Sequence, residues 1–215
     1  MTDAALVVFA RAPIEGQVKS RLAATLGTAQ ATRVYAALLA LALRRAAAWD
    51  GPRAIACADE PGLAYFRELP LAAGFDCFLQ EGADLGTRMR AALGQGLASA
   101  PAAVLIGTDV ADHAPEDLPT ARRMLGEADI VLGPVADGGY WLIGVRGDQP
   151  ALFQGIPWST AQVLSATLAR SAGLSVRLLP VRHDVDDAGS PWIDSEGGLR
   201  LAESRAWELR PLETN

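Results

Sequence analysis

The chain has 215 residues, of which 50% are apolar and 20% are charged, and its formal net charge is -6. This length suits one well-packed domain, and the composition is ordinary for a globular protein. The acidic balance argues against general nucleic-acid binding, which usually shows as a basic face, but it leaves room for a local basic pocket.

Strands and helices are expected to alternate along the first half of the chain. Residues 4–10 are apolar and β-branched, and they predict a buried strand. A strong helix is expected over residues 29–48, with Thr28 as its N-cap and Gly51-Pro52 as its stop. The elements expected next are strand 53–58, helix 61–69, strand 75–79, helix 85–98 and strand 103–106.

The same alternation continues to the end of the chain. Residues 115–127 predict a helix with Pro115 in its first turn, and residues 130–132 predict a strand. Residues 140–145 follow a Gly-Gly pair and alternate weakly, which predicts an antiparallel strand. The last expected elements are helix 160–172, strand 175–179 and helix 198–207. Repeated units of this kind predict an α/β fold, with a mostly parallel mixed sheet and helices on both faces, in a single domain over residues 1–215.

The first expected strand leads into a loop that holds the only lysine of the chain. Lys19 stands in Phe9-Ala-Arg-Ala-Pro-Ile-Glu-Gly-Gln-Val-Lys-Ser-Arg-Leu22, whereas all other basic residues are arginine. Open α/β sheets bind ligands at the carboxyl ends of strands, and phosphate sites often combine Lys with Arg. Arg11, Lys19 and Arg21 therefore indicate an anion site; the alternative is a plain basic surface loop.

Three acidic segments follow later strands. Asp109 ends the run Ile106-Gly-Thr-Asp, where it can hold Mg²⁺ or Mn²⁺ against a diphosphate or simply cap a helix. The segment Asp137-Gly138-Gly139 can bring backbone amides close to a ligand or form a plain hairpin turn. Asp184 and Asp186 lie on one side of an extended segment, where they can share a cation or stay solvated. Together with the basic loop, these acids indicate metal-assisted transfer from a nucleotide diphosphate.

Five segments, taken as an ordered set, resemble a known family. They are residues 9–22, Gln80-Glu-Gly-Ala-Asp-Leu-Gly-Thr-Arg-Met89, Ile106-Gly-Thr-Asp109, Asp137-Gly-Gly-Tyr-Trp-Leu-Ile-Gly144 and Ile156-Pro-Trp-Ser-Thr160. The set is similar to a family of bacterial glycosyltransferase-like proteins, formerly a domain of unknown function, with some members assigned to arsenosugar biosynthesis. This resemblance covers most of the chain and implies the Rossmann-like GT-A fold of nucleotide-diphospho-sugar transferases. The family is also related to small nucleotidyltransferases.

The resemblance implies a set of site residues. Those implied to line the nucleotide and its phosphates are Ala10, Arg11, Lys19 and Arg21. Those implied to meet the base are Gln80, Gly86 and Thr87. The implied ligands of Mg²⁺ or Mn²⁺ are Asp109 and Asp186. Those implied to shape the sugar or acceptor side are Asp137, Gly138 and Gly139. The implied catalytic set is Lys19, Arg21, Asp109 and Asp137.

The chain departs from the family pattern at two places. Thr108-Asp-Val-Ala111 stands where Ser-Asp-Cys-Pro is typical, so the aspartate is kept while the neighbouring acceptor surface is put in question. Lys-Ser-Arg stands where Lys-Thr-Arg is usual, which keeps a hydroxyl group.

Three functions stay open at this point. The first is a glycosyltransferase that moves a sugar from a nucleotide-sugar donor to a small-molecule acceptor. The second is a guanylyl- or cytidylyltransferase-like nucleotidyltransferase, whose relatives usually have a more glycine-rich first loop than this one. The third is a nucleotide-sensing module without catalysis, which the retained acidic positions disfavour. The base, the sugar, the acceptor, the stereochemical outcome and the oligomeric state are left open.

The remaining features predict little chemistry. The apolar stretch 32–48 is interrupted by arginines, so we expect no membrane span. The N-terminus reaches the first expected strand by Ala4 without a charged segment and a long apolar segment, so we expect no signal peptide and a cytoplasmic enzyme. Trp158 either stacks on a ligand or packs in the core, with the core favoured slightly. His113 and His183 lack metal-ligand spacing and are expected at the surface or behind the site.

Overall fold

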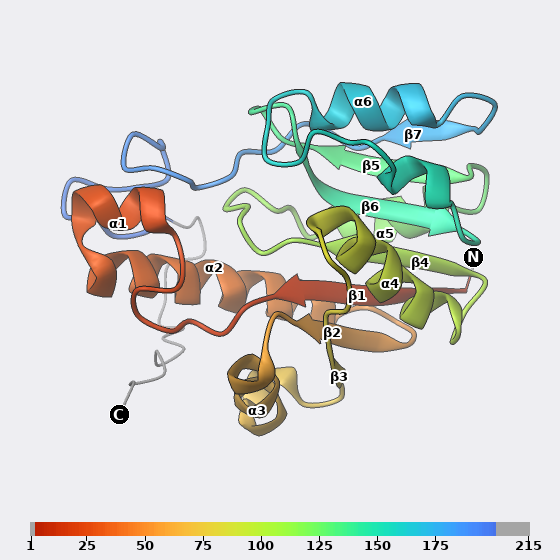
Figure 1. Ribbon diagram of the computed structural model, residues 1–215. Coiled ribbons are helices and arrows are strands. Elements are labelled where there is room, and N and C mark those ends of the chain that lie inside the picture. Colours follow the sequence, from red (N-terminus) through yellow and green to blue (C-terminus); the bar gives the residue numbers. More distant parts are fainter. Residues whose placement is uncertain (1–2, 201–215) are drawn as a thin grey trace.

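A computed structural model of the chain describes residues 3–200. Within them, seven strands form one sheet in the order β3-β2-β1-β4-β6-β5-β7 (Figure 1). The strands are β1 (Ala4–Ala10), β2 (Arg53–Cys57), β3 (Asp76–Leu79), β4 (Ala102–Ile106), β5 (Ile130–Pro134), β6 (Tyr140–Arg146) and β7 (Val176–Leu178). Strand β6 runs antiparallel to β4 and β5, and the other pairs are parallel. The expected mixed sheet is confirmed, including its antiparallel strand.

Helices cover both faces of the sheet, as predicted. On one face lie α2 (Thr28–Ala47), α3 (Glu60–Glu68) and α5 (Asp117–Met124). On the other lie α4 (Leu85–Leu97), α6 (Val163–Arg170) and the 3-10 helix η2 (Pro150–Phe153). The alternation of side chains along β1 divides the core, because Leu6 and Val8 pack on the first face and Val7 on the second.

The structure corrects several expected element ends. Helix α1 (Ser20–Leu26) was not expected, because it is short and begins at a residue with no capping side chain. Helix α2 begins after Gly27, so Thr28 is not its N-cap. Helix α5 begins at Asp117, whose carboxylate accepts from the amide of Ala114 and holds the preceding residues in a turn.

The C-terminal part of the described chain returns to the first two helices. Leu22 of α1, Leu38 of α2 and Val185 form a third core cluster, and Figure 1 shows the blue segment after β7 beside α1. Of the expected helix 198–207, Leu199 instead forms a bridge with Ile193, and residues 201–207 lie outside the described residues.

The 3-10 helix η1 (Pro70–Ala72) precedes β3. Among the described helices, none has the length and apolar character needed to cross a membrane.

Candidate active site

A pocket of about 560 Å³ opens at the carboxyl ends of the parallel strands β1 to β4. Strand β1 leads by crossovers to β2 on one side, while β4 pairs with its other edge, so the strand order reverses here. Ligands of open α/β sheets bind at such a switch point, and this volume suits a small organic ligand. The lining residues include Ala10, Arg11, Lys19, Tyr35, Gln80, Arg88, Thr108 and Asp109.

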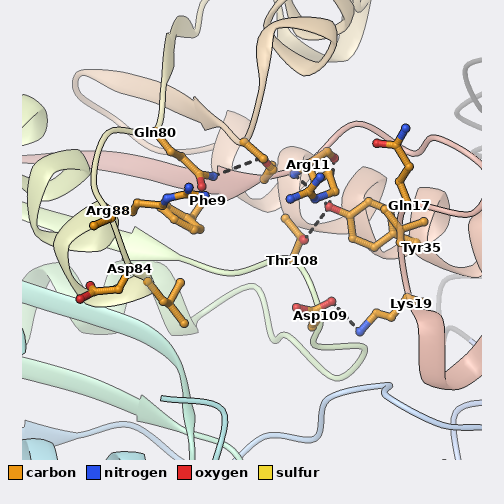
Figure 2. A pocket seen from close by; sticks show the side chains of 15 residues that line it. Phe9, Arg11, Gln17, Lys19, Tyr35, Gln80, Asp84, Arg88, Thr108 and Asp109 are labelled. Carbon is orange, nitrogen blue, oxygen red and sulfur yellow. Dashed lines mark hydrogen bonds and ion pairs between the residues drawn. The ribbon is translucent and has the colours of Figure 1, made fainter. Parts of the chain in front are cut away.

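Lys19 points its ammonium group at two carboxylates (Figure 2 shows the first). Its Nζ lies 2.6 Å from Oδ1 of Asp109 and 2.9 Å from Oδ1 of Asp186, and the side chain is only 7% exposed. Burial alone lowers the pKa of Lys19, but the two facing carboxylates outweigh it, so the pKa is raised above its ordinary value. The lysine is therefore a firmly charged group inside the protein.

The backbone of Lys19 helps to aim that ammonium. Lys19 is the residue before α1, and its φ of 49° and ψ of 51° place it in the left-handed region. That conformation costs a residue other than glycine about 1–2 kcal/mol, so the contacts around it must hold it there. Arg21, two residues on, is exposed and has a guanidinium nitrogen 3.8 Å from Oδ2 of Asp186. The predicted basic loop thus meets two of the predicted acids.

A short segment, residues 182–186, carries acids to Lys19 at the wall of the pocket; we call it the acidic strap. The guanidinium of Arg182 donates two hydrogen bonds, of 2.9 and 2.6 Å, to the buried carboxylate of Asp117. The amide of Val185 donates to the carbonyl of Asp109 at 2.9 Å. The first contact fixes the strap to the start of α5 and the second fixes it to the loop that follows β4, and so they place Asp186 beside Asp109.

The strap also completes a group of three carboxylates: Asp137, Asp184 and Asp186, with oxygens that lie within 4.8 Å of one another. We call these three residues the acidic cluster. Burial and the neighbouring charges of Asp137 and Asp186 raise the pKa of Asp184 to about 6. Carboxylate oxygens at this spacing are the ligands that Mg²⁺ and Mn²⁺ prefer. The alternative role of Asp109 as a helix cap is wrong, since α5 begins eight residues later.

Tyr35 is a site residue that the sequence analysis missed. Its hydroxyl donates to the carbonyl of Arg11 at 3.0 Å and accepts from the amide of Arg11 at 3.2 Å and from Oγ1 of Thr108 at 3.3 Å. It therefore ties the end of β1 to the loop after β4, across the switch point. The guanidinium of Arg11 itself lies 3.1 Å from Asp59. A tyrosine in the middle of an amphipathic helix has a core pattern, which gave no signal of this contact.

Gln80 lies at the other end of the pocket from Lys19 (Figure 2). Its side-chain amide donates to the carbonyls of Ala56 at 2.9 Å and Ala10 at 3.4 Å. Since both partners are acceptors, the NH₂ group must face them, and the carbonyl oxygen of Gln80 is left for a ligand. Arg88, which was not predicted, lines the same end and can donate.

Gly86 and Thr87 do not line this pocket. Gly86 lies under the indole of Trp158, which is 2.7 Å from the position of a Cβ on that glycine. Trp158 therefore packs against the structure, as its core interpretation predicted. Thr87 forms a reciprocal capping box with Asp84 at the start of α4. Among residues 85–88, the side chains that line the pocket are Leu85 and Arg88.

The turn between β5 and β6 holds Asp137, Gly138 and Gly139, so the hairpin-turn interpretation is confirmed. The carboxylate of Asp137 accepts from the amide of Gly139 at 2.9 Å. Gly138 has a φ of +93°, and a Cβ there would lie 2.2 Å from the carbonyl oxygen of Ala161. The turn thus needs a glycine at position 138, and it holds Asp137 close to Asp184 and Asp186.

The two histidines have different environments. His113 is 5% exposed and its ring lies 4.5 Å from that of Trp141, so a surface position is wrong for it. Burial lowers the pKa of His113 to about 4. His183 is exposed and its Nδ1 lies 2.9 Å from the carboxylate of Asp112, beside the acidic strap.

Comparison with known proteins adds a family and several folds. The profile of a family described as "Uncharacterized protein conserved in bacteria (DUF2064)" matches residues 40–160, more than half of the chain. A protein from Desulfovibrio desulfuricans G20, provisionally named a nucleotide-diphospho-sugar transferase, is 31% identical and superposes with a TM-score of 0.80. That match covers 87% of this chain and 84% of the other. No curated protein matches.

More distant solved structures share the fold alone. CMP:2-keto-3-deoxy-manno-octonic acid synthetase complexed with CTP is 13% identical, with a TM-score of 0.57 over 86% of this chain and 94% of that one. Glucosyl-3-phosphoglycerate synthase from Mycobacterium tuberculosis, in complex with Mn²⁺, UDP and glucosyl-3-phosphoglycerate, is 12% identical, with a TM-score of 0.53 over 86% and 72% of the two chains. The expected Rossmann-like fold of nucleotide-sugar transferases is thereby confirmed.

Proposed function

The chain belongs to this family of bacterial proteins (DUF2064), as its motifs indicated, and we propose that it is a metal-assisted, single-domain glycosyltransferase. It moves a sugar from a nucleotide-diphospho-sugar donor to a small-molecule acceptor. The observation that carries the proposal is the contact of Lys19 with Asp109 and Asp186 at the wall of a pocket that lies on the switch point. The assignment of the relative from Desulfovibrio desulfuricans G20 supports the donor class.

A divalent cation fits the acids of this site. Asp109 and Asp186 would hold it, with Asp184 and Asp137 near by to balance its charge. When bound, Mg²⁺ or Mn²⁺ would neutralise the negative charge that develops on the departing diphosphate. The Mn²⁺ and UDP in the mycobacterial synthase, a protein of the same fold, are consistent with this.

The chain's own residues would bind and orient the donor. Lys19 and Arg21 would contact the phosphates, with Arg11 held in place through its backbone by Tyr35. Gln80 would accept a hydrogen bond from an N–H group of the base. Asp137, on the opposite strand pair, would face the sugar or the acceptor. The first loop has one glycine with positive φ, Gly16, which suits a diphosphate better than a wrapped triphosphate.

The test is a thermal-shift panel of nucleoside diphosphates, their sugars and triphosphates, with and without Mn²⁺, on wild type and Asp109→Ala. We expect one diphosphate and its sugar to raise Tm only with Mn²⁺, and the variant to lose the effect. A ligand at 100 times its Kd stabilises by about 2.7 kcal/mol, which is easily measured. Consumption of that nucleotide sugar in the presence of acceptor mixtures would then report transfer.

The same panel separates the proposal from nucleotidyl transfer. A triphosphate that stabilises more than any diphosphate or nucleotide sugar, followed by release of pyrophosphate, would replace the glycosyltransferase with a nucleotidyltransferase. Equal stabilisation of wild type and Asp109→Ala, without a need for Mn²⁺, would point to a nucleotide-sensing protein.

A further inference from the structure

Lys19 combines three properties that a phosphate-binding lysine does not require. Its backbone is in the left-handed region, its side chain is almost fully buried, and its ammonium already contacts two carboxylates. Yet Lys19 also lines the pocket that the phosphates would enter. The acids and an incoming phosphate therefore compete for the same ammonium group.

The acids at this place outnumber the bases that face them. Asp186 belongs to the acidic cluster of three carboxylates, and Asp109 is a fourth acid on the other side of Lys19. Facing these four carboxylates are the Lys19 ammonium and the guanidinium of Arg21, which is 75% exposed and therefore well screened. Carboxylates crowded in this way repel one another, and a cation of higher charge relieves the repulsion better than an ammonium does.

Only one cation can occupy the point between Asp109 and Asp186. The Nζ of Lys19 is 2.6 Å from one carboxylate and 2.9 Å from the other, which are the distances of charge-assisted hydrogen bonds. A second positive charge in contact with both oxygens would meet the ammonium directly. Binding of a metal ion through these two Oδ1 atoms therefore requires Lys19 to leave.

We propose that Lys19 is the internal counter-ion of Asp109 and Asp186, and that a divalent cation bound by these two residues displaces its ammonium toward the pocket. This inference rests on the proposed function. The released ammonium stays on the loop that lines the pocket, where it can contact a phosphate. The cation and a nucleoside diphosphate then strengthen each other's binding, because each favours the arrangement in which Lys19 has left the acids.

The probe is Mn²⁺ alone, added to the full chain, with electron paramagnetic resonance reporting the free ion. We expect Lys19→Met, whose unbranched side chain is one atom shorter and carries no charge, to bind Mn²⁺ roughly tenfold more tightly than wild type, because no group has to be displaced first. In the absence of metal, Lys19→Met should have a lower Tm than wild type, since two acids lose their partner. Mn²⁺ should raise the Tm of the variant more than that of wild type.

Matched variants separate displacement from a general loss of positive charge. Arg21→Met removes a neighbouring base that does not occupy the point between the acids, and it should change the Kd for Mn²⁺ by no more than about threefold. Adding Asp109→Asn to Lys19→Met should remove the tenfold gain in Mn²⁺ affinity. Adding Asp137→Asn to Lys19→Met should leave most of that gain. If Lys19→Met does not fold by circular dichroism, Lys19→Gln takes its place.

Two outcomes overturn the inference in different ways. If wild type binds Mn²⁺ and the Lys19 variants bind it no more tightly, or no more tightly than Arg21→Met, the displacement is wrong and the proposed metal-assisted function survives. If neither wild type nor any variant binds Mn²⁺, the displacement and the metal in the proposed function fall together.

Discussion

At the scale of single residues, Tyr35 is the residue outside the acidic groups whose hydrogen bonds matter most for the shape of the pocket. Its hydroxyl forms hydrogen bonds with the amide and the carbonyl of Arg11 and with the hydroxyl of Thr108. Those groups flank the pocket on both sides of the switch point. Their positions therefore depend on one side chain from α2, and so does the geometry that we propose binds phosphate.

Tyr35→Phe should lower the free energy of unfolding by about 1–3 kcal/mol, because it leaves part-buried backbone groups of Arg11 without their partner. It should also weaken binding of the nucleotide found by the thermal-shift panel. Urea unfolding and a binding titration measure the two effects. The matched control is Tyr65→Phe: within the described chain the buried Tyr65 hydroxyl has no hydrogen-bond partner, so its removal should cost far less. Equal losses in the two variants would contradict this account.

The residues that the sequence analysis found, and those it missed, differ in a physical way. Lys19 and Asp109 were predicted from a basic loop and an acidic segment that follow apolar strands, and Asp186 was implied as a metal ligand by the family resemblance. The structure brings all three residues into contact. Tyr35 and Arg182 act through contacts between distant segments, which no local pattern shows. Their roles become visible only when the chain is folded.

At the scale of elements, the turn between β5 and β6 shows how the backbone serves the site. Gly138 passes so close to the carbonyl of Ala161 that any side chain would collide with it, and its φ of +93° disfavours other residues in any case. The close approach joins the turn to the segment that precedes α6. Because Asp137 comes directly before Gly138, the close contact of Gly138 with Ala161 also fixes the position of one member of the acidic cluster.

Gly138→Ala should therefore cost more than the conformational penalty of about 1–2 kcal/mol that positive φ alone imposes. Gly147→Ala is the matched control, because Gly147 has a φ of +75° but nothing lies within 4 Å of its added Cβ. The difference between the two variants in urea unfolding isolates the collision. We also expect Gly138→Ala alone to weaken Mn²⁺ binding, through Asp137. Similar stability losses would show that the turn can move aside.

Most elements could be predicted from the sequence, and the exceptions share one cause. The strands and long helices follow from apolar periodicity, whereas the cap that Asp84 provides for α4 was found only in the structure. Helix α1 could not be predicted, since it begins at a left-handed lysine that is held by tertiary contacts. The bend before α5 likewise depends on Asp117, whose carboxylate binds the amide of Ala114.

At the scale of the whole molecule, stability should depend on pH through His113. Its pKa is about 4 in the folded protein because it is buried, against an ordinary value of 6.5. The unfolded chain therefore binds more protons between these values, and this contribution to stability is lost as the pH falls from 6.5 toward 4. Asp184 acts in the opposite direction, since its raised pKa of about 6 makes the folded state bind the proton more readily.

The variant His113→Leu separates these two effects. Relative to wild type, it should gain stability as the pH falls from 6.5 to 4, by up to about 1.4 kcal/mol per pH unit. Urea unfolding at half-unit steps measures this difference. If the difference in the free energy of unfolding between wild type and His113→Leu did not change with pH, the lowered pKa of His113 would be refuted.

The contact between Lys19 and Asp186 joins residues that are 167 positions apart in the chain. During synthesis, the loop that carries the lysine leaves the ribosome long before the acidic strap exists. A nascent chain that ends after β6 contains Lys19 and Asp109 but lacks Asp184 and Asp186. Contacts of such long range form late, because the intervening chain must first be ordered. We therefore expect the proposed binding site to be completed late in folding.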